Sequence, residues 1–190
     1  MIIKEHINVK DDRLIDGLTP VVRIMSQIEN LREQEVTIDF SDTRFISPVF
    51  ALSLIVYISR CGKQISFKNV PDYLELIGLS NGGIKPDEMR QTEFLASLEK
   101  YASKTYIPII DFAAGRNSDA KEVVSSIAEN MIIRQLNIRS NVANGLKYMV
   151  DETLDNITEH SDSDRGYIFA QAYPTKGFLD VCIADRGINL

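Results

Sequence analysis

The sequence is poor in cysteine and histidine. Among 190 residues there are two cysteines, Cys61 and Cys182, and two histidines, His6 and His160. The cysteines lie far apart, each within an apolar run, and form no CxxC pair that would indicate a zinc site. We therefore expect both to be buried free thiols, which is consistent with a reducing compartment.

Long basic runs and long apolar runs are also missing. The net charge is -6, which argues against a nucleic-acid footprint or an anionic-membrane anchor. The longest apolar run, residues 48–59, is too short to span a bilayer and contains two serines. The N-terminus lacks the cationic and then apolar pattern of a signal peptide. The sequence predicts a cytoplasmic protein that binds neither nucleic acid nor membrane.

What remains is an ordinary globular composition, with 44% hydrophobic and 25% charged residues. In the first part of the chain, strand-like and helix-like segments alternate, which predicts a small α/β layer domain over residues 1–84. The predicted strands are residues 1–9, 35–40 and 64–70, and the predicted helices are residues 14–31, 47–60 and 71–80. Ser47 is the expected N-cap of its helix, with Pro48 at the first helical position.

A second domain is predicted over residues 104–190, after a helical connector over residues 85–103. Its expected order is a strand, two helices and a β-hairpin that turns at "TKG". The strand is residues 105–113, the helices are residues 120–137 (capped by Ser118 or Asp119) and 141–160, and the hairpin strands are residues 166–174 and 178–185.

The helix at residues 141–160 carries a row of polar side chains. Glu152, Asn156 and His160 recur every four residues, so they share one edge of the helix. We expect a broad buried face made of Leu146, Met149, Val150, Thr153, Leu154 and Ile157, and a second, more exposed row made of Asp151, Asp155 and Glu159.

Spacing alone leaves two explanations for Glu152 and Asn156. A solvated helix face is the ordinary one, because charged faces are common. The other is a metal–nucleotide site, since an Asn carbonyl oxygen suits Mg²⁺, which usually takes one or two protein ligands plus substrate phosphates. A Glu one turn earlier could act as a general base toward a water molecule.

A second candidate lies in "CIADRGINL". Asp185 ends a predicted strand and Gly187 follows in the turn. A carboxylate there can accept a hydrogen bond from the exocyclic amine of adenine, and glycine lets the backbone approach the base. A simple turn is the alternative explanation.

Together, "DETLDNITEHS", the hairpin and "ADRGIN" resemble, in this order, the GHKL ATPase superfamily of DNA gyrase B, heat-shock protein 90, histidine kinases and MutL. The resemblance implies that Glu152 handles the proton of the attacking water and that Asn156, in the N box, coordinates Mg²⁺. It also implies that Asp185 binds the adenine amine of ATP and that Gly187 shapes the loop. His160 and Ser161 match the tail of kinase-like members, although a structural role at the helix end is favoured for His160.

The sequence departs from that family at two points. Asn189 stands where the loop usually has a second glycine, and the sequence reaches Leu190 before the Gly-rich phosphate loop and the lid. We expect a truncated chain rather than a natural partial domain, and we expect it to bind ATP poorly and to hydrolyse it negligibly.

The first domain has a resemblance of its own. "VTIDFSDTRFISPVFALSLIVYIS" is similar to the STAS domain of anti-sigma-factor antagonists. That family often carries a phosphorylatable serine near the start of this helix. Ser47 is the nearby hydroxyl here, and helix capping accounts for it without phosphorylation.

The predicted architecture is therefore α/β, a STAS-like sandwich followed by a partial GHKL (Bergerat) two-layer domain. The predicted function is that of an ATP-binding signalling protein with a protein partner. When complete, it would be an ATPase or a protein serine kinase.

A non-catalytic scaffold with a degenerate ATPase half is the alternative, and a homodimer is left open. A metal-dependent hydrolase using Glu152, Asp155 and His160 is weak, because Asp155 lies off the row. A histidine autokinase is disfavoured, because His6 is the only histidine upstream.

Overall fold

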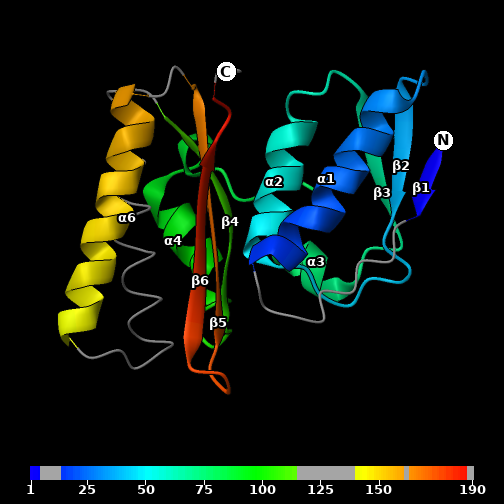
Figure 1. Cartoon of the computed structure of the whole chain (residues 1–190). Helices are drawn as coiled ribbons and strands as arrows, with labels where there is room; N and C mark the ends of the chain where they lie inside the picture. Colours follow the sequence, from blue (N-terminus) through cyan, green and yellow to red (C-terminus); the bar gives the residue numbers. More distant parts are fainter. Residues whose placement is uncertain (5–13, 115–139, 161–162, 188–190) are drawn as a thin grey trace. The chain divides into compact units, whose positions relative to one another are not determined.

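The computed structural model describes residues 1–4, 14–114, 140–160 and 163–187 (Figure 1). Its contacts divide the chain into two compact units, Met1–Gly83 and Ile84–Leu190. Each unit combines helices with one three-stranded sheet, which confirms the α/β class. The predicted helix at residues 120–137, with its cap, lies outside the described residues.

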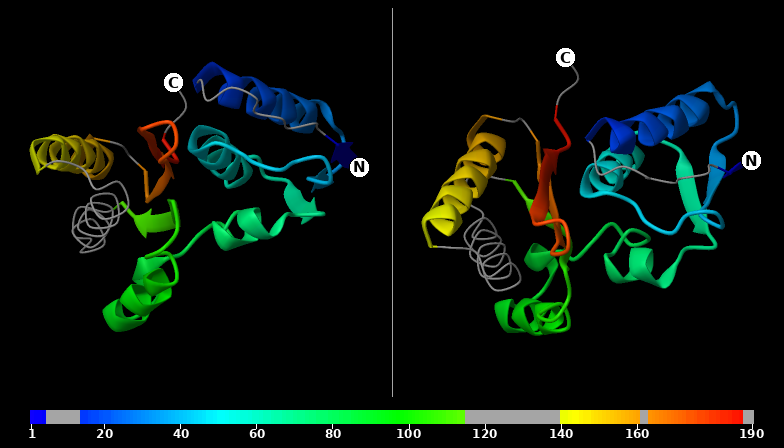
Figure 2. Two further views of the ribbon diagram at one scale, coloured as in Figure 1. Left: turned by 90° about the horizontal axis from the view of Figure 1, so that it is seen from below. Right: turned by 60° about the horizontal axis from the view of Figure 1, so that its bottom comes forward.

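Unit 1 is a parallel sheet that alternates with helices. Its strands are β1 (Ile2–Lys4), β2 (Glu35–Asp39) and β3 (Gln64–Lys68), paired in that order, and its helices are α1 (Leu14–Asn30), α2 (Pro48–Ile58) and α3 (Asp72–Leu76). Consecutive parallel strands joined by right-handed crossovers place their helices on one face of the sheet. Figures 1 and 2 show α1 and α2 together on one side of it.

The two faces of this sheet differ accordingly. Ile3, Val36 and Ile38 are buried on the face toward the helices. On the other face Thr37 and Ser66 are cross-strand neighbours, and their hydroxyl oxygens lie 2.9 Å apart. Unit 1 is therefore a two-layer arrangement with one polar sheet face.

The start of α2 follows the predicted capping pattern. Ser47 Oγ accepts a hydrogen bond from the Phe50 N–H at 3.3 Å, and Pro48 occupies the first turn. Pro48 has no N–H to leave unpaired, so it fits this position. The helix ends at Ile58, and Gly62 then adopts a φ of 68° in the turn before β3.

Unit 2 is built on an antiparallel sheet. Its strands are β4 (Tyr106–Ala113), β5 (Arg165–Tyr173) and β6 (Phe178–Asp185), in that order, and its described helices are η1 (Pro86–Glu88), α4 (Gln91–Glu99) and α6 (Ser140–His160). The predicted hairpin is confirmed. Its turn closes through the Lys176 and Gly177 N–H groups, which both donate to the Tyr173 carbonyl at 2.9 Å.

Residues 85–103, the expected connector, fall within unit 2. The Ile84 N–H donates to the Ile109 carbonyl at 2.8 Å, and the Asp111 N–H donates to the Ile84 carbonyl at 2.9 Å. Phe94 and Leu98 of α4 are buried. This segment therefore adds an edge bridge and a helix to the second unit.

The buried face of α6 is narrower than predicted. Val150, Leu154 and Ile157 are buried, but Met149 is 66% exposed and Thr153 is exposed, so the prediction for these two residues was wrong. The buried side chains form one stripe, and Met149 and Thr153 lie outside it. The cysteine prediction was also wrong about burial, because Cys61 and Cys182 are free but only half-buried.

Thr43, in the loop between β2 and α2, is a buried polar residue. It is 4% exposed, and within the described structure its Oγ1 has no hydrogen-bond partner. A hydroxyl in that position loses its hydration without compensation. The Thr43 N–H, by contrast, donates to the Phe40 carbonyl at 2.8 Å.

We expect Thr43→Val to raise the free energy of unfolding by about 1 kcal/mol, because it replaces the unpaired hydroxyl with a methyl group of similar size. Urea unfolding followed by circular dichroism measures the change. Thr92→Val, on an exposed part of α4, is the control and should change stability by less than about 0.5 kcal/mol. A loss of stability in Thr43→Val would contradict the assignment.

Candidate functional site

Asp185 and Gly187 lie where β6 ends. Asp185 is the last residue of the strand and pairs with Gly166 of β5. Gly187 has a φ of 31°, and a Cβ at this position would lie 2.9 Å from Asp185 Oδ1. Any other residue here would crowd the carboxylate, so glycine allows the side chain of Asp185 to fold beside its own turn.

The end of α6 and the end of β6 lie at the same end of unit 2. α6 ends at His160 and β5 begins at Arg165, next to the residue that pairs with Asp185. In Figure 1 both ends lie at the top of the view. The topology therefore places the C-terminal end of α6 and the turn after β6 at one end of the sheet.

Glu152 and Asn156 occupy the exposed face of α6. This face lies opposite the buried stripe and also carries Tyr148 and Met149, which are 65% and 66% exposed. Across the part of the chain that the structure describes, no hydrogen bond or ion pair joins Glu152 or Asn156 to Asp185. The side chain of His160 lies outside the described residues.

The prediction for the second polar row of α6 was wrong. Asp151 and Asp155 are half-buried, whereas Glu152 and Asn156 are exposed. The reason is the position of the buried stripe, because Asp151 and Asp155 each follow one of its residues directly. The row of Glu152 and Asn156 is therefore the more exposed one, whereas we expected the row of Asp151 and Asp155 to be more exposed.

The described residues contain no group of three or more His, Cys, Asp or Glu side chains that could hold a metal ion. The described residues therefore do not form a metal site in which protein side chains supply all the ligands. The exposed amide oxygen of Asn156 fits the other kind of site, in which Mg²⁺ keeps several waters and takes further ligands from phosphates.

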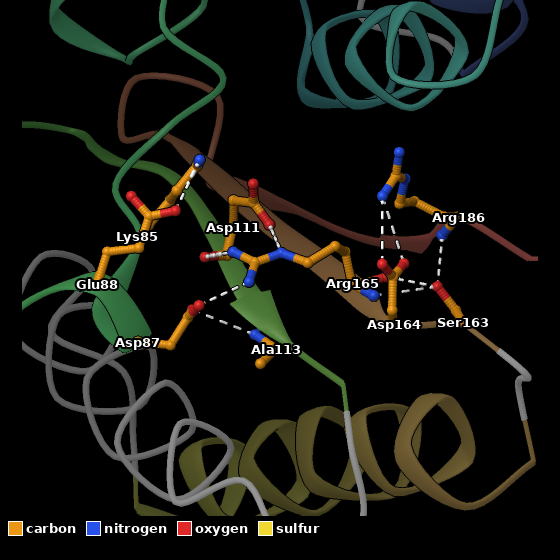
Figure 3. Close-up of polar contacts among 9 residues, drawn as sticks. All are labelled: Lys85, Asp87, Glu88, Asp111, Ala113, Ser163, Asp164, Arg165 and Arg186. Carbon is orange, nitrogen blue, oxygen red and sulfur yellow. Dashed lines mark hydrogen bonds and ion pairs between the residues drawn. The ribbon is translucent and has the colours of Figure 1, made fainter.

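A cluster around Arg165, which we did not predict from the sequence, supports this end of the sheet (Figure 3). Arg165 Nε donates to Asp111 Oδ1 at 2.7 Å, and Nη2 donates to the Asp111 carbonyl at 3.0 Å. Nη1 donates to Asp87 Oδ2 at 2.6 Å, and the other oxygen of Asp87 accepts from the Ala113 N–H at 3.3 Å. One side chain thereby connects η1, β4 and β5.

The charges in this cluster are largely withdrawn from water. The side chains of Arg165 and Asp111 are 17% and 9% exposed. Burial raises the pKa of Asp111, and the hydrogen bond from Arg165 only partly opposes it. Burial alone would also raise the pKa of Asp87, but the hydrogen bond and the charge of Arg165, together with backbone hydrogen bonds, outweigh it and lower that pKa. For Arg165, the two carboxylates outweigh burial and raise the pKa, so the guanidinium stays charged.

Ser163 connects this cluster to the turn after Asp185 (Figure 3). Its hydroxyl donates to the Arg165 carbonyl at 2.7 Å and accepts from the Arg165 N–H at 3.3 Å. It also accepts from the Arg186 N–H at 3.0 Å. A sequence signal for the cluster did exist, since Asp111 is the only charge within the apolar strand "YIPIIDFA".

Comparison of the chain with family models, with curated proteins and with solved structures found no match. Within the described residues, none of the helices combines the length and the apolar character needed to cross a membrane.

We expect Arg165→Met to lower the free energy of unfolding of unit 2 by about 3 kcal/mol, because Asp111 would remain buried without its counter-charge. Urea unfolding measures the total change, and hydrogen exchange of β4 and β5 amides locates it. Arg90→Met is the control, since Arg90 pairs with Glu93 at the surface and should contribute less than about 1 kcal/mol. Equal effects of the two variants would contradict this role of Arg165.

Cys182, on β6, should react slowly with alkylating reagents. Burial, with a further contribution from Asp180, raises the pKa of its thiol to about 11. Because the thiolate is the nucleophile, the rate for Cys182 in a Cys61→Ser background should rise about tenfold per pH unit between pH 7 and pH 10. Mass spectrometry after iodoacetamide treatment measures this rate. The same protein in urea is the control, and a folded-state plateau near pH 9 would contradict the shift.

Proposed function

We propose that this chain is an ATP-binding signalling protein of the GHKL kind, acting in the cytoplasm on a protein partner. In this proposal unit 1 is a STAS-like docking module and unit 2 is part of a Bergerat-type ATPase domain. The observation that carries it is the position of Asp185, at the end of β6 and two residues before Gly187, whose positive φ favours glycine. Asp185 pairs with Gly166, the second residue of β5, and β5 is the strand that follows α6.

Each residue has a defined role in the proposed site. The Asp185 carboxylate accepts a hydrogen bond from the exocyclic amine of adenine, and Gly187 leaves room for the base. Asn156 supplies an amide oxygen to Mg²⁺, whose other ligands are water and phosphate oxygens. Glu152, one turn earlier on the same exposed face, accepts a proton from the attacking water or hydroxyl.

The strand–helix order and the capped start of α2 support the STAS-like assignment of unit 1. Asp39 ends β2 and its Oδ1 accepts hydrogen bonds from the Ser41 N–H and Asn69 Nδ2, both at 2.9 Å. These bonds fix the loop that leads to α2. Ser47 Oγ is engaged as the N-cap, so we assign it a structural role and place partner recognition on the surface around this loop.

A specific observation favours a second candidate, a non-catalytic interaction module. Tyr148 and Met149 are large apolar side chains, 65% and 66% exposed, on the same face of α6 as Glu152 and Asn156. Exposed apolar side chains grouped on one helix face are typical of a protein-binding surface. In this alternative α6 binds a polypeptide and the adenine loop has no ligand.

Titration of the ¹⁵N-labelled chain with Mg·ATP, followed by NMR, separates the two candidates. We expect weak binding, with shifts concentrated at residues 185–187 and in the C-terminal half of α6. Asp185→Asn should weaken binding about tenfold, because one charge-assisted hydrogen bond to the amine loses its ionised acceptor. GTP should bind more weakly than ATP, because guanine presents a carbonyl oxygen where adenine has the amine.

Two further variants sharpen this test. Asn156→Ala should remove the difference between ATP titrations with Mg²⁺ and with EDTA. Asp180→Asn is the matched control, because it removes another half-buried carboxylate from the same strand. Equal effects of Asp185→Asn and Asp180→Asn would contradict the nucleotide site, and no shift at millimolar ATP would leave the interaction module as the better assignment.

A further inference from the structure

The turn that carries Asp185 is held by a side chain outside it. We infer that Ser163 is a positioning residue, whose hydroxyl fixes the backbone at Arg186 and thereby directs the Asp185 carboxylate toward the nucleotide base. This inference rests on the proposed function, because it assigns a supporting residue to the same site. Ser163 itself touches neither base nor phosphate in this scheme.

The hydrogen bonds of Ser163 use the whole capacity of its hydroxyl. A serine hydroxyl has one donor and two acceptor positions. Here it donates to the Arg165 carbonyl at 2.7 Å and accepts from the N–H groups of Arg165 and Arg186 at 3.3 and 3.0 Å. One small side chain therefore ties the start of β5 to the first residue beyond β6.

The alternatives for holding Arg186 are weaker. Strand pairing ends at Gly166 and Asp185, and the Arg186 N–H lies 3.3 Å from the Arg165 carbonyl, longer than its contact with Ser163. The side chain of Arg186 reaches Asp164 only at 3.4 Å, and that carboxylate is 75% exposed. An exposed pair of this kind contributes little. Of the two contacts described for this amide, the one with Ser163 is thus the shorter.

The other end of the connection is rigid. Arg165 is fixed by Asp111 and Asp87, so its backbone offers a stable reference for Ser163. Arg186 stands between Asp185 and Gly187, where a Cβ on the glycine would meet Asp185 Oδ1 at 2.9 Å. Because Arg186 shares a peptide bond with Asp185, a change in the Arg186 backbone also changes the backbone torsions that direct the Asp185 carboxylate.

Three variants of the full chain test this role. Ser163→Ala removes the hydroxyl, Ser163→Thr retains it, and Ser97→Ala is the matched control. Ser97 is also half-buried in unit 2, and its hydroxyl donates to the Phe94 carbonyl at 2.7 Å on α4, away from the turn. The readouts are amide exchange of Arg186 by NMR and the dissociation constant for Mg·ATP.

We expect Ser163→Ala to speed exchange at Arg186 and to weaken ATP binding, each about fivefold, as for the loss of one ordinary hydrogen bond. Ser163→Thr should restore both values, and Ser97→Ala should change neither. The difference in affinity between Mg·ATP and metal-free ATP should persist in Ser163→Ala, because Asn156 is untouched.

Unchanged exchange at Arg186 in Ser163→Ala would overturn the inference. Faster exchange with unchanged ATP affinity would also overturn it, since the turn would then be held without directing the carboxylate. Absence of ATP binding by the parent chain is a different result. It would overturn the proposed function, while the exchange measurement would still show whether Ser163 holds the turn.

Discussion

The charge of Arg165 is the constraint on which unit 2 depends. A guanidinium that is 17% exposed must find partners within the protein, because its hydration has largely been removed. It finds them in two carboxylates and one carbonyl, contributed by η1 and β4. The segment before α4 and the start of β5 are therefore held at fixed positions against β4. This is why residues that could have formed a connector are instead part of the unit.

Fixing Arg165 also fixes the backbone of β5 that leads to the candidate site. Gly166 follows Arg165 and pairs with both Phe112 and Asp185 on its two sides. The fully buried ring of Phe112 covers Gly166, so that a Cβ there would overlap the ring. An aromatic side chain packed over a glycine in a neighbouring strand fixes their register. The position of Asp185 is thus determined by packing on one side of β5 and by Ser163 at its start.

Local signals in the sequence predicted the elements but not these contacts. Ser47 and Pro48 locate the start of α2, and Gly177 locates the hairpin turn, because each acts on its own backbone. Asp111 and Arg165 are 54 residues apart, and Asp87 and Arg165 are 78 apart. Periodicity shows which side of a strand a residue occupies, but it does not identify a partner at such a distance. The same limit explains Met149, whose spacing fits a buried face although the covering elements leave it exposed.

The exposed face of α6 changes in character along its length, and this relates the two candidate functions. Asn156 lies near the end of α6 that adjoins the hairpin, whereas Tyr148 lies eight residues earlier, about 12 Å along the axis. In the proposed site, a nucleotide whose Mg²⁺ is held by Asn156 would occupy the polar end of this face and leave the apolar end accessible. A partner bound at Tyr148 and Met149 would then lie within reach of the bound nucleotide. In the proposed arrangement ATP and a protein partner would occupy different ends of this face, and the shared face would be the physical route for coupling them.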